Sequence, residues 1–293
     1  MQRHSPRVHA LQLLNQKLAS SRKRLYSPSE LAEIIAEIRR EWGLSQTLTI
    51  NKFRDLALES KALQEVRLTT TYPLHTTRYH RGKFTPYELA LSLRPHSYLS
   101  HGTAAVLHDL TTSQPDFVYV NQEQSAKDTS GSLTQAAINR AFSAKQRQSK
   151  FIVTHEKTKI MLLSGKDTNR LGVQEIAGIQ GEMLEITNLE RTLIDIVVRP
   201  GYAGGTQRVL HCYRRAIQRI SVERLTEMLE ELDYIYPYHQ AIGFLLQCAG
   251  HDPKSLTNLR KLGMNHDFFL AHGMKKTKLD REWRIHYPDE FLI

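Results

Sequence analysis

The sequence predicts an α+β protein built of two parts, and three patterns support this prediction. Apolar residues repeat at helical spacing near the N-terminus, short β-branched and aromatic runs fill the middle of the chain, and helical spacing returns after them. A chain of 293 residues is long enough for two domains, each with its own core. We predict a first domain over residues 1–83 and a second over 84–293, in which a sheet with helices (84–207) precedes a mainly helical section with a candidate final strand (208–293).

Three helices are predicted in the first 60 residues. The first begins at Ser5-Pro6, because proline is tolerated in a first helical turn. The second begins at Ser27-Pro28-Ser29-Glu30, which has the spacing of a capping box, and ends at Gly43. Thr49 is the predicted cap of the third. The three predicted apolar stripes are Val8, Leu11, Leu14 and Leu18; Leu31, Ile34, Ile35 and Ile38; and Ile50, Phe53, Leu56 and Ala57.

A hairpin is predicted after the third helix, with strands over Leu63–Thr70 and Thr76–His80 and a turn at Tyr72-Pro73. Three helices followed by such a hairpin are the element order of a winged helix-turn-helix. In that arrangement the third helix lies in the major groove and presents its N-terminal side chains to base edges. Here those side chains are Asn51, Lys52 and Arg54, and Asn and Arg are suited to bidentate contacts with bases.

Positive charge is concentrated in the first domain. Residues 1–83 hold 15 Lys and Arg against 7 Asp and Glu, a net charge of +8, whereas the other 210 residues have a net charge of +2. This distribution favours binding to double-stranded DNA, although a solvated helix face beside an ordinary β-ribbon is the alternative. The predicted further contacts, mainly to phosphates, are Arg22, Lys23, Arg24, Arg67, His75, Arg78 and Arg81.

The second part is predicted to be a mixed, mostly antiparallel sheet with helices packed on it. Thr85-Pro86 begins a helix through Leu93, and Ser97 or Ser100 caps an apolar helix ending near Leu110. The predicted strands are Phe117–Val120, Phe151–Thr154, Ile160–Leu163, Val173–Ala177 and Met183–Thr187, with Trp283–Tyr287 as the candidate final strand. The predicted later helices are Gln135–Ala144, Leu189–Val198, one with Leu210, Tyr213, Ile217 and Ile220 on one face, Ser221–Leu232 and Pro237–Cys248, and Asn121–Ser132 is a predicted loop.

Two segments of the second part resemble motifs of the AbiEi-type antitoxins. Tyr98–Leu110, with the letters YLSHGTAAVLHDL, is similar to that family's S-H-x-S-A-L-x-L-H-G-L segment. Asn188–Asp195, with the letters NLERTLID, followed by Pro200 and Gly204-Gly205, is similar to its P-E-R-T-L-x-D…P…G-G stretch. Together with the winged helix, the resemblance spans about residues 20 to 290. Asp109 stands where the family pattern usually has glycine, and Asn188-Leu189 replaces the usual residues before Glu190-Arg191-Thr192.

The resemblance implies a transcriptional repressor that is also the antitoxin of a type IV toxin–antitoxin pair in phage defence. Such a protein binds inverted repeats in its own promoter through the winged helix. It counters a nucleotidyltransferase-type toxin functionally rather than as a stable complex. Inverted repeats require two copies of the protein, as a dimer or as monomers that cooperate on DNA. Regulation of another defence locus without antitoxin activity is the alternative.

The motif residues also have structural interpretations. Arg191, Thr192 and Asp195 share one helix, on which Arg191 and Asp195 can pair at i,i+4 to hold a junction together or to contact a partner. Ser100 is predicted to be a helix cap rather than a nucleophile. His101 is predicted to cap or pack, like His108, because no third metal ligand is evident.

A basic helix face is predicted after Gly205, with Arg208, His211, Arg215 and Arg219 on it. It is a solvated face, a surface for an acidic protein, or a set of additional phosphate contacts by Arg208, Arg215 and Arg219.

Enzyme signatures are weak, so we predict no enzyme, no cofactor and no metal. A restriction-type nuclease needs an Asp and then Glu-x-Lys, but Asp116 is followed by Glu123-Gln124-Ser125, without the lysine. A metal-dependent nuclease with dispersed acids is kept as an alternative. With only Cys212 and Cys248, and no apolar run of membrane-spanning length, we expect a cytoplasmic protein without membrane contact. A transit peptide is the alternative interpretation of the basic N-terminal stretch.

Overall fold

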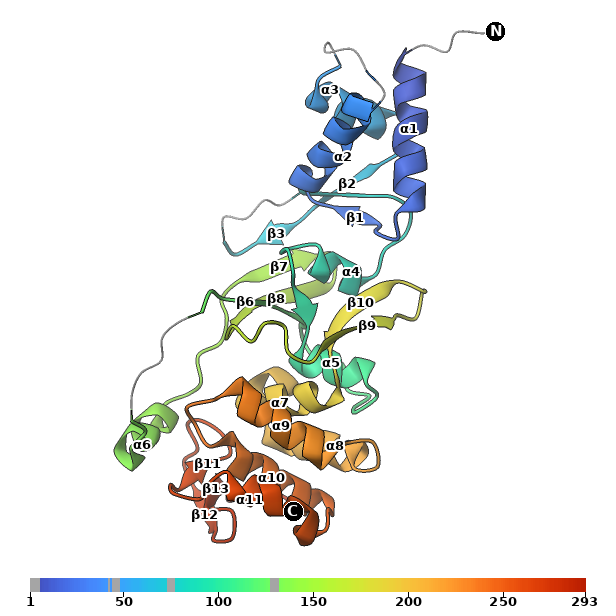
Figure 1. Ribbon diagram of the computed structural model, residues 1–293. Helices are drawn as coiled ribbons and strands as arrows, with labels where there is room; N and C mark the ends of the chain where they lie inside the picture. Colours follow the sequence, from blue (N-terminus) through green and yellow to red (C-terminus); the bar gives the residue numbers. More distant parts are fainter. Residues whose placement is uncertain (1–5, 42, 44–47, 73–76, 127–131) are drawn as a thin grey trace.

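The computed structural model describes residues 6–41, 43, 48–72, 77–126 and 132–293. It is elongated, with three regions along its length (Figure 1). The N-terminal helices occupy one end, a seven-stranded mixed sheet lies in the middle, and a helical section with the C-terminus occupies the other end. The predicted α+β fold class is therefore confirmed.

The N-terminal region holds three helices and a small antiparallel sheet. The helices are α1 (Pro6–Ser20), α2 (Pro28–Glu41) and α3 (Ile50–Glu59). The sheet has the order β1-β4-β2, formed by β1 (Leu25–Tyr26), β4 (Thr77–His80) and β2 (Gln64–Arg67). This is the succession of elements expected from the sequence, with β1 as an addition.

The predicted starts of the second and third helices are confirmed by their capping hydrogen bonds, whereas Ser5 of the first lies outside the described residues. Ser27 N donates to Glu30 Oε2 (2.8 Å) and Glu30 N donates to Ser27 Oγ (3.2 Å), so both halves of the capping box of α2 are formed. Thr49 Oγ1 accepts from Lys52 N at the start of α3. The predicted stripe of α1 is partly wrong, because Val8 is 44% exposed and the inner face uses Ala10 and Leu13 beside Leu14 and Leu18.

The predicted hairpin does not end as a free wing. The expected strand Leu63–Thr70 divides into β2 and β3 (Thr69–Thr70), and β3 joins the seven-stranded sheet, where it pairs antiparallel with β7 (Ile152–His155). Thr71 Oγ1 donates to Lys150 O (2.7 Å), and the rings of Tyr72 and Phe151 lie 4.4 Å apart. The hairpin is therefore docked on the second sheet along the described residues that follow β2.

The seven-stranded sheet has the order β3-β7-β8-β6-β5-β10-β9. The pairs β6·β8 and β5·β10 are parallel and the other four are antiparallel, which agrees with the mostly antiparallel prediction. Helix α4 (Pro86–Leu91) begins at a second capping box, Thr85 with Glu88, and α5 (His101–Leu107) follows β5. The strands not yet bounded are β5 (Tyr98–Leu99), β6 (Val118–Glu123), β8 (Thr158–Gly165), β9 (Val173–Ala177) and β10 (Met183–Thr187).

One hydrophobic cluster joins the N-terminal region to the large sheet. Leu25, Val66 and Leu68 belong to the same buried cluster as Leu99 and Val120 of the seven-stranded sheet. Burial of apolar area across this junction stabilises the arrangement seen in Figure 1. The domain boundary at residue 83 remains a prediction.

The far end of the molecule is mainly helical. Its elements are α6 (Gln135–Ser143), α7 (Leu189–Val198), the 3₁₀ turn η1 (Pro200–Ala203), α8 (Thr206–Ala216), α9 (Val222–Leu232), α10 (Tyr238–Ala249), η2 (Pro253–Leu256) and α11 (Thr257–Lys261). The predicted final strand is present as β13 (Ile285–Pro288), between β11 (Phe268–Phe269) and β12 (Thr277–Asp280), which were not predicted. Among the helices of the described residues, none combines the length and apolar character needed to cross a membrane.

Candidate nucleic-acid interface and a buried polar cluster

The predicted base-reading residues lie together on one face of α3. Asn51 and Lys52 are exposed, while Phe53 and Ala57 are buried on the opposite face. The Arg54 guanidinium donates to Asp55 Oδ1 (2.7 Å) and to Asn51 Oδ1 (3.4 Å). Since these partners are exposed, the guanidinium can exchange them for a base edge at a small cost in free energy.

Four of the other predicted cations are also at the surface. Arg22 and Lys23 lie between α1 and β1, and Arg81 follows β4. Lys23 pairs with Glu30, and Arg67 pairs with Glu65 (2.7 Å) while its side chain remains 87% exposed. Exposed pairs of this kind contribute about 0–1 kcal/mol, so a phosphate can replace the carboxylate.

The prediction that Arg78 contacts DNA is wrong. Arg78 is only 5% exposed, and its guanidinium donates to the carbonyls of Ser92 (3.0 Å) and Leu93 (3.1 Å) at the end of α4. Burial lowers the pKa of this guanidinium. The residue therefore ties β4 to the second part of the chain.

Arg24 has a related connecting role. Its guanidinium donates to the carbonyls of Lys83 (3.3 Å) and Gln180 (3.2 Å), and it lies 3.6 Å from Glu88. Arg24 is half-buried whereas Arg22 is exposed, so the Arg24 side chain is less accessible to a phosphate. His75 lies outside the described residues.

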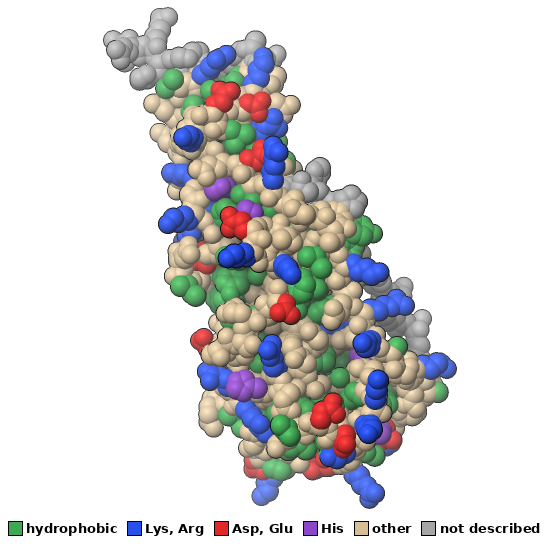
Figure 2. Space-filling view, turned by 180° about the vertical axis from the view of Figure 1, so that it is seen from behind, with side chains coloured by type: hydrophobic (Ala, Val, Ile, Leu, Met, Phe, Trp, Pro, Cys, Tyr) green, Lys and Arg blue, Asp and Glu red, His purple; other side chains and the backbone are tan. Residues whose placement is uncertain are grey.

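Most acidic side chains of the N-terminal region lie on one helix, α2. Four of the seven acids of residues 1–83 lie on α2, namely Glu30, Glu33, Glu37 and Glu41. Lys17 of α1 pairs with Glu37 (2.7 Å) beside them. Figure 2 shows basic and acidic side chains interspersed on this end of the molecule. The acids of α2 lie beside Lys23 and Arg40, so positive charge is not confined to one face.

The basic face of α8 reaches back to α5. Arg215 Nε donates to Asp109 O (2.9 Å), and Arg219 Nη1 donates to His108 O (2.6 Å). Both arginines therefore satisfy carbonyls at the C-terminal end of α5, where cations are favourable. Arg208 is exposed, and a phosphate role for these three arginines remains a prediction.

The backbone at Asp109 has a conformation that favours glycine. Asp109 has φ = +57°, in the left-handed region just after α5, a backbone conformation that glycine adopts without strain and Asp tolerates better than most residues.

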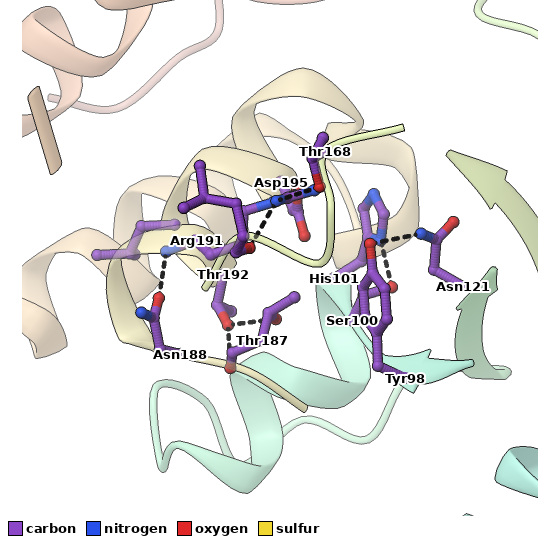
Figure 3. Close-up of polar contacts among 12 residues, drawn as sticks. Tyr98, Ser100, His101, Asn121, Thr168, Thr187, Asn188, Arg191, Thr192 and Asp195 are labelled. Atoms are coloured by element: carbon purple, nitrogen blue, oxygen red, sulfur yellow. Dashed lines mark hydrogen bonds and ion pairs between the residues drawn. The ribbon is translucent and has the colours of Figure 1, made fainter. Parts of the chain in front are cut away.

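The two motif segments meet in the interior (Figure 3). Arg191 Nε donates to Asp195 Oδ1 (2.9 Å), and the two side chains are only 5% and 8% exposed. Arg191 Nη1 also donates to Leu171 O (2.8 Å) and Thr168 Oγ1 (3.2 Å), and Thr192 Oγ1 lies 2.8 Å from Thr187 Oγ1. Although burial opposes the charged form, the Asp195 carboxylate raises the pKa of Arg191 above its usual range. The predicted i,i+4 pair is confirmed.

Ser100 and His101 form the other side of this cluster. Ser100 is fully buried and occupies the N-cap position of α5, as predicted, but its Oγ lies 2.8 Å from His101 Nδ1 and makes no capping hydrogen bond to the backbone. His101 has φ = +51°, an uncommon backbone conformation for a residue other than glycine. The next residue must be glycine, because a Cβ at Gly102 would lie 2.5 Å from the backbone carbonyl oxygen of Tyr202. These residues hold η1 against α5.

Glu123, one of the acids considered for a nuclease site, is held by several hydrogen bonds. The Glu123 carboxylate accepts from the backbone N–H groups of Thr168 (3.1 Å) and Arg170 (3.1 Å) and from the Tyr98 hydroxyl (2.9 Å). His108 Nε2 donates a hydrogen bond to Thr187 O (2.7 Å), which connects the end of α5 to β10. Within the described ranges, no three His, Cys, Asp or Glu side chains form a group that could hold a metal ion.

The chain thus has an α+β fold whose N-terminal region has a net positive charge and whose interior holds a buried ion pair. No protein-family model matches it, and no curated protein is significantly similar. Its fold is similar to a solved structure, that of the RV2827C protein from Mycobacterium tuberculosis, with a TM-score of 0.54 and 15% sequence identity. The match covers 95% of this chain and 91% of that chain, so the likeness of fold extends over nearly the whole length.

Proposed function

We propose that this protein is a DNA-binding transcriptional repressor that acts in the cytoplasm on its own promoter. The observation that carries the proposal is the exposed N-terminal end of α3, where Asn51, Lys52 and Arg54 lie together in a region of net charge +8. The region serves as a winged helix-turn-helix: α3 enters the major groove, while Arg22, Lys23, Arg67 and Arg81 contact phosphates. Two copies on inverted repeats then exclude polymerase.

The test compares binding to the DNA upstream of the protein's own gene with binding to scrambled DNA of equal length, across a series of salt concentrations. We expect a preference of about a thousandfold or more at ~0.15 M salt. The variant N51A/K52A/R54A should lose about 100-fold of the affinity for the upstream DNA, because bidentate contacts with bases contribute about 1–3 kcal/mol each.

A matched control removes the same charge elsewhere. The variant K275A/K276A, at two exposed positions near the C-terminus, should bind both DNAs as the wild type does. Equal, steeply salt-dependent binding of the wild type to both DNAs would mean that the charge is a phosphate footprint without sequence reading. The repressor proposal would then be abandoned.

We also propose that the second part acts as the antitoxin of a type IV pair. The support is the resemblance of Tyr98–Leu110 and Asn188–Asp195 to AbiEi-type motifs, because these segments pack on each other around the Arg191–Asp195 pair. The counterpart would be a nucleotidyltransferase-type toxin, opposed functionally rather than in a stable complex.

Co-expression with a nucleotidyltransferase-type protein encoded beside the gene tests this role. We expect the wild type to restore growth of a host that the toxin arrests, and N51A/K52A/R54A to restore it equally, since the changed residues lie in the DNA-binding region. If neither the wild type nor N51A/K52A/R54A restores growth, the antitoxin proposal is wrong, and regulation of another defence locus is the favoured function.

A further inference from the structure

A large cavity lies between the ends of strands β6 and β8 and part of the helical section. Its volume is about 1090 Å³, at the upper end of the range for pockets that enclose small ligands. Its walls come from the ends of β6 and β8, from the helix α7 and turn η1, from the tyrosine-rich segment after α9, and from residues 144–151. Nothing in the proposed reading of DNA by α3 uses this cavity.

The cavity lining is cationic. Five Lys or Arg and three Asp line it. Two of the five cations already have partners: Arg191 pairs with Asp195, and Lys166 Nζ donates to the carbonyls of Leu232 (2.8 Å) and Asp233 (2.6 Å). Lys145, Arg147 and Arg199 remain, and within the described residues none of the three is in an ion pair. Arg199 Nη1 donates to the backbone carbonyl of Arg147 (3.1 Å), so the Arg199 side chain lies beside the backbone of Arg147, and both residues line the cavity. A cluster of such side chains suits a phosphate, which Arg binds in a bidentate manner.

Aromatic rings supply the other half of the lining. Tyr202, Tyr234 and Tyr236 face the cavity, with His101 and the buried amide of Asn121 at its floor. The His101 ring lies 5.3 Å from the Tyr202 ring, and its Nδ1 is engaged by Ser100, which leaves Nε2 as its ligand-binding edge. Flat rings beside polar edges are the surroundings that a heteroaromatic base prefers, because the base can stack and form hydrogen bonds.

We propose that this cavity binds a nucleoside phosphate. The base lies against the tyrosine rings near His101 and Asn121, and the phosphate lies at Lys145, Arg147 and Arg199. Inorganic phosphate alone would leave the aromatic half of the cavity unused, and a nucleoside alone would leave the arginines without an anion.

The cavity wall is joined to the DNA-binding region, and this step rests on the proposed function. Phe151 lines the cavity and contacts Tyr72, while Thr71 Oγ1 bonds to Lys150 O and accepts from Ile152 N (3.1 Å). Residues 149–152 therefore contact the ligand space on one side and the hairpin after β2 on the other. A nucleotide that orders this wall changes the affinity of the protein for DNA.

The first experiment uses the full-length protein without DNA, so its outcome is independent of the repressor proposal. Isothermal titration with ATP, GTP, adenosine and inorganic phosphate should show binding of a nucleotide that is at least about tenfold tighter than binding of adenosine or phosphate alone. The variant R147A/R199A should weaken nucleotide binding by about tenfold or more, because each arginine supplies a charge-assisted hydrogen bond. The matched control R214A/R281A, at exposed positions outside the lining, should bind as the wild type does.

Three results would overturn the proposal: binding of neither nucleotide at millimolar concentration, unchanged nucleotide binding by R147A/R199A, or phosphate binding as tight as nucleotide binding. A thermal melt of R147A/R199A that matches the wild type excludes misfolding, and the charge-conserving R147K/R199K variant should recover part of the affinity. If a nucleotide binds but leaves the affinity for the upstream DNA unchanged, the coupling step is wrong and the site stands.

Discussion

Replacing Arg191 with methionine is expected to lower the free energy of unfolding by about 3–5 kcal/mol, the usual cost of breaking a buried ion pair on one side. The change leaves the Asp195 carboxylate buried without its cation and removes the donor to Leu171 O. Urea unfolding followed by circular dichroism measures the loss.

Two further variants test whether the loss of stability in R191M comes from the unpaired Asp195 charge or from the loss of side-chain volume. The double variant R191M/D195L removes both charges, so it should recover most of the stability that R191M loses. The variant K278M breaks an exposed pair with Asp289 (3.0 Å) and should cost less than about 1 kcal/mol. If R191M lost as little as K278M, the buried ion pair and the hydrogen bond of Arg191 to Leu171 O would not contribute to stability as inferred.

Acid is expected to destabilise the protein between pH 6.5 and about 4, in part through His101. Burial lowers the pKa of His101 from its ordinary 6.5 to about 4, so the unfolded chain binds a proton in this window and the folded chain does not. The stability from the neutral ring is therefore complete above pH 6.5 and is lost as the pH falls toward 4. This contribution is roughly 3 kcal/mol.

The variant H101N tests this contribution, because asparagine tolerates the left-handed backbone of this position and does not titrate. Burial also lowers the pKa of His108, His239, His251 and His272, so the wild type has several such contributions. Unfolding free energies at pH 7 and pH 4 should differ less in H101N than in the wild type. Parallel pH profiles would show that His101 does not titrate as inferred.

Elements with local start signals were predictable from the sequence. The capping residues Ser27, Thr49 and Asn188 mark their helices because each satisfies a backbone donor three residues ahead. The strands β9 and β10 agree with prediction residue for residue. The two-residue strands β1, β5 and β11 were missed, because a strand so short is defined by its partner and not by its own pattern.

The candidate site residues also fall into two groups: those that local spacing brings together and those that only the folded chain brings together. The neighbours Asn51, Lys52 and Arg54 share a helix face, so spacing alone groups them. Arg78 looked like its charged neighbours in the hairpin, and only the distant carbonyls of Ser92 and Leu93 show its different role. The cavity was not predicted, because Lys145, Arg199 and Tyr234 come from separate elements and meet only in the folded chain.

The path of the chain through β3 sets an order of events during synthesis. Thr69 and Thr70 reach their native pairing only through Thr154 and Val153, and Arg78 finds its acceptors at Ser92 and Leu93. During synthesis, the chain must therefore emerge from the ribosome as far as β7 before β3 can form its native strand pairing. Until then, the short strand β3 has no partner strand for its backbone groups. The segment made first is thus among the last to be finished.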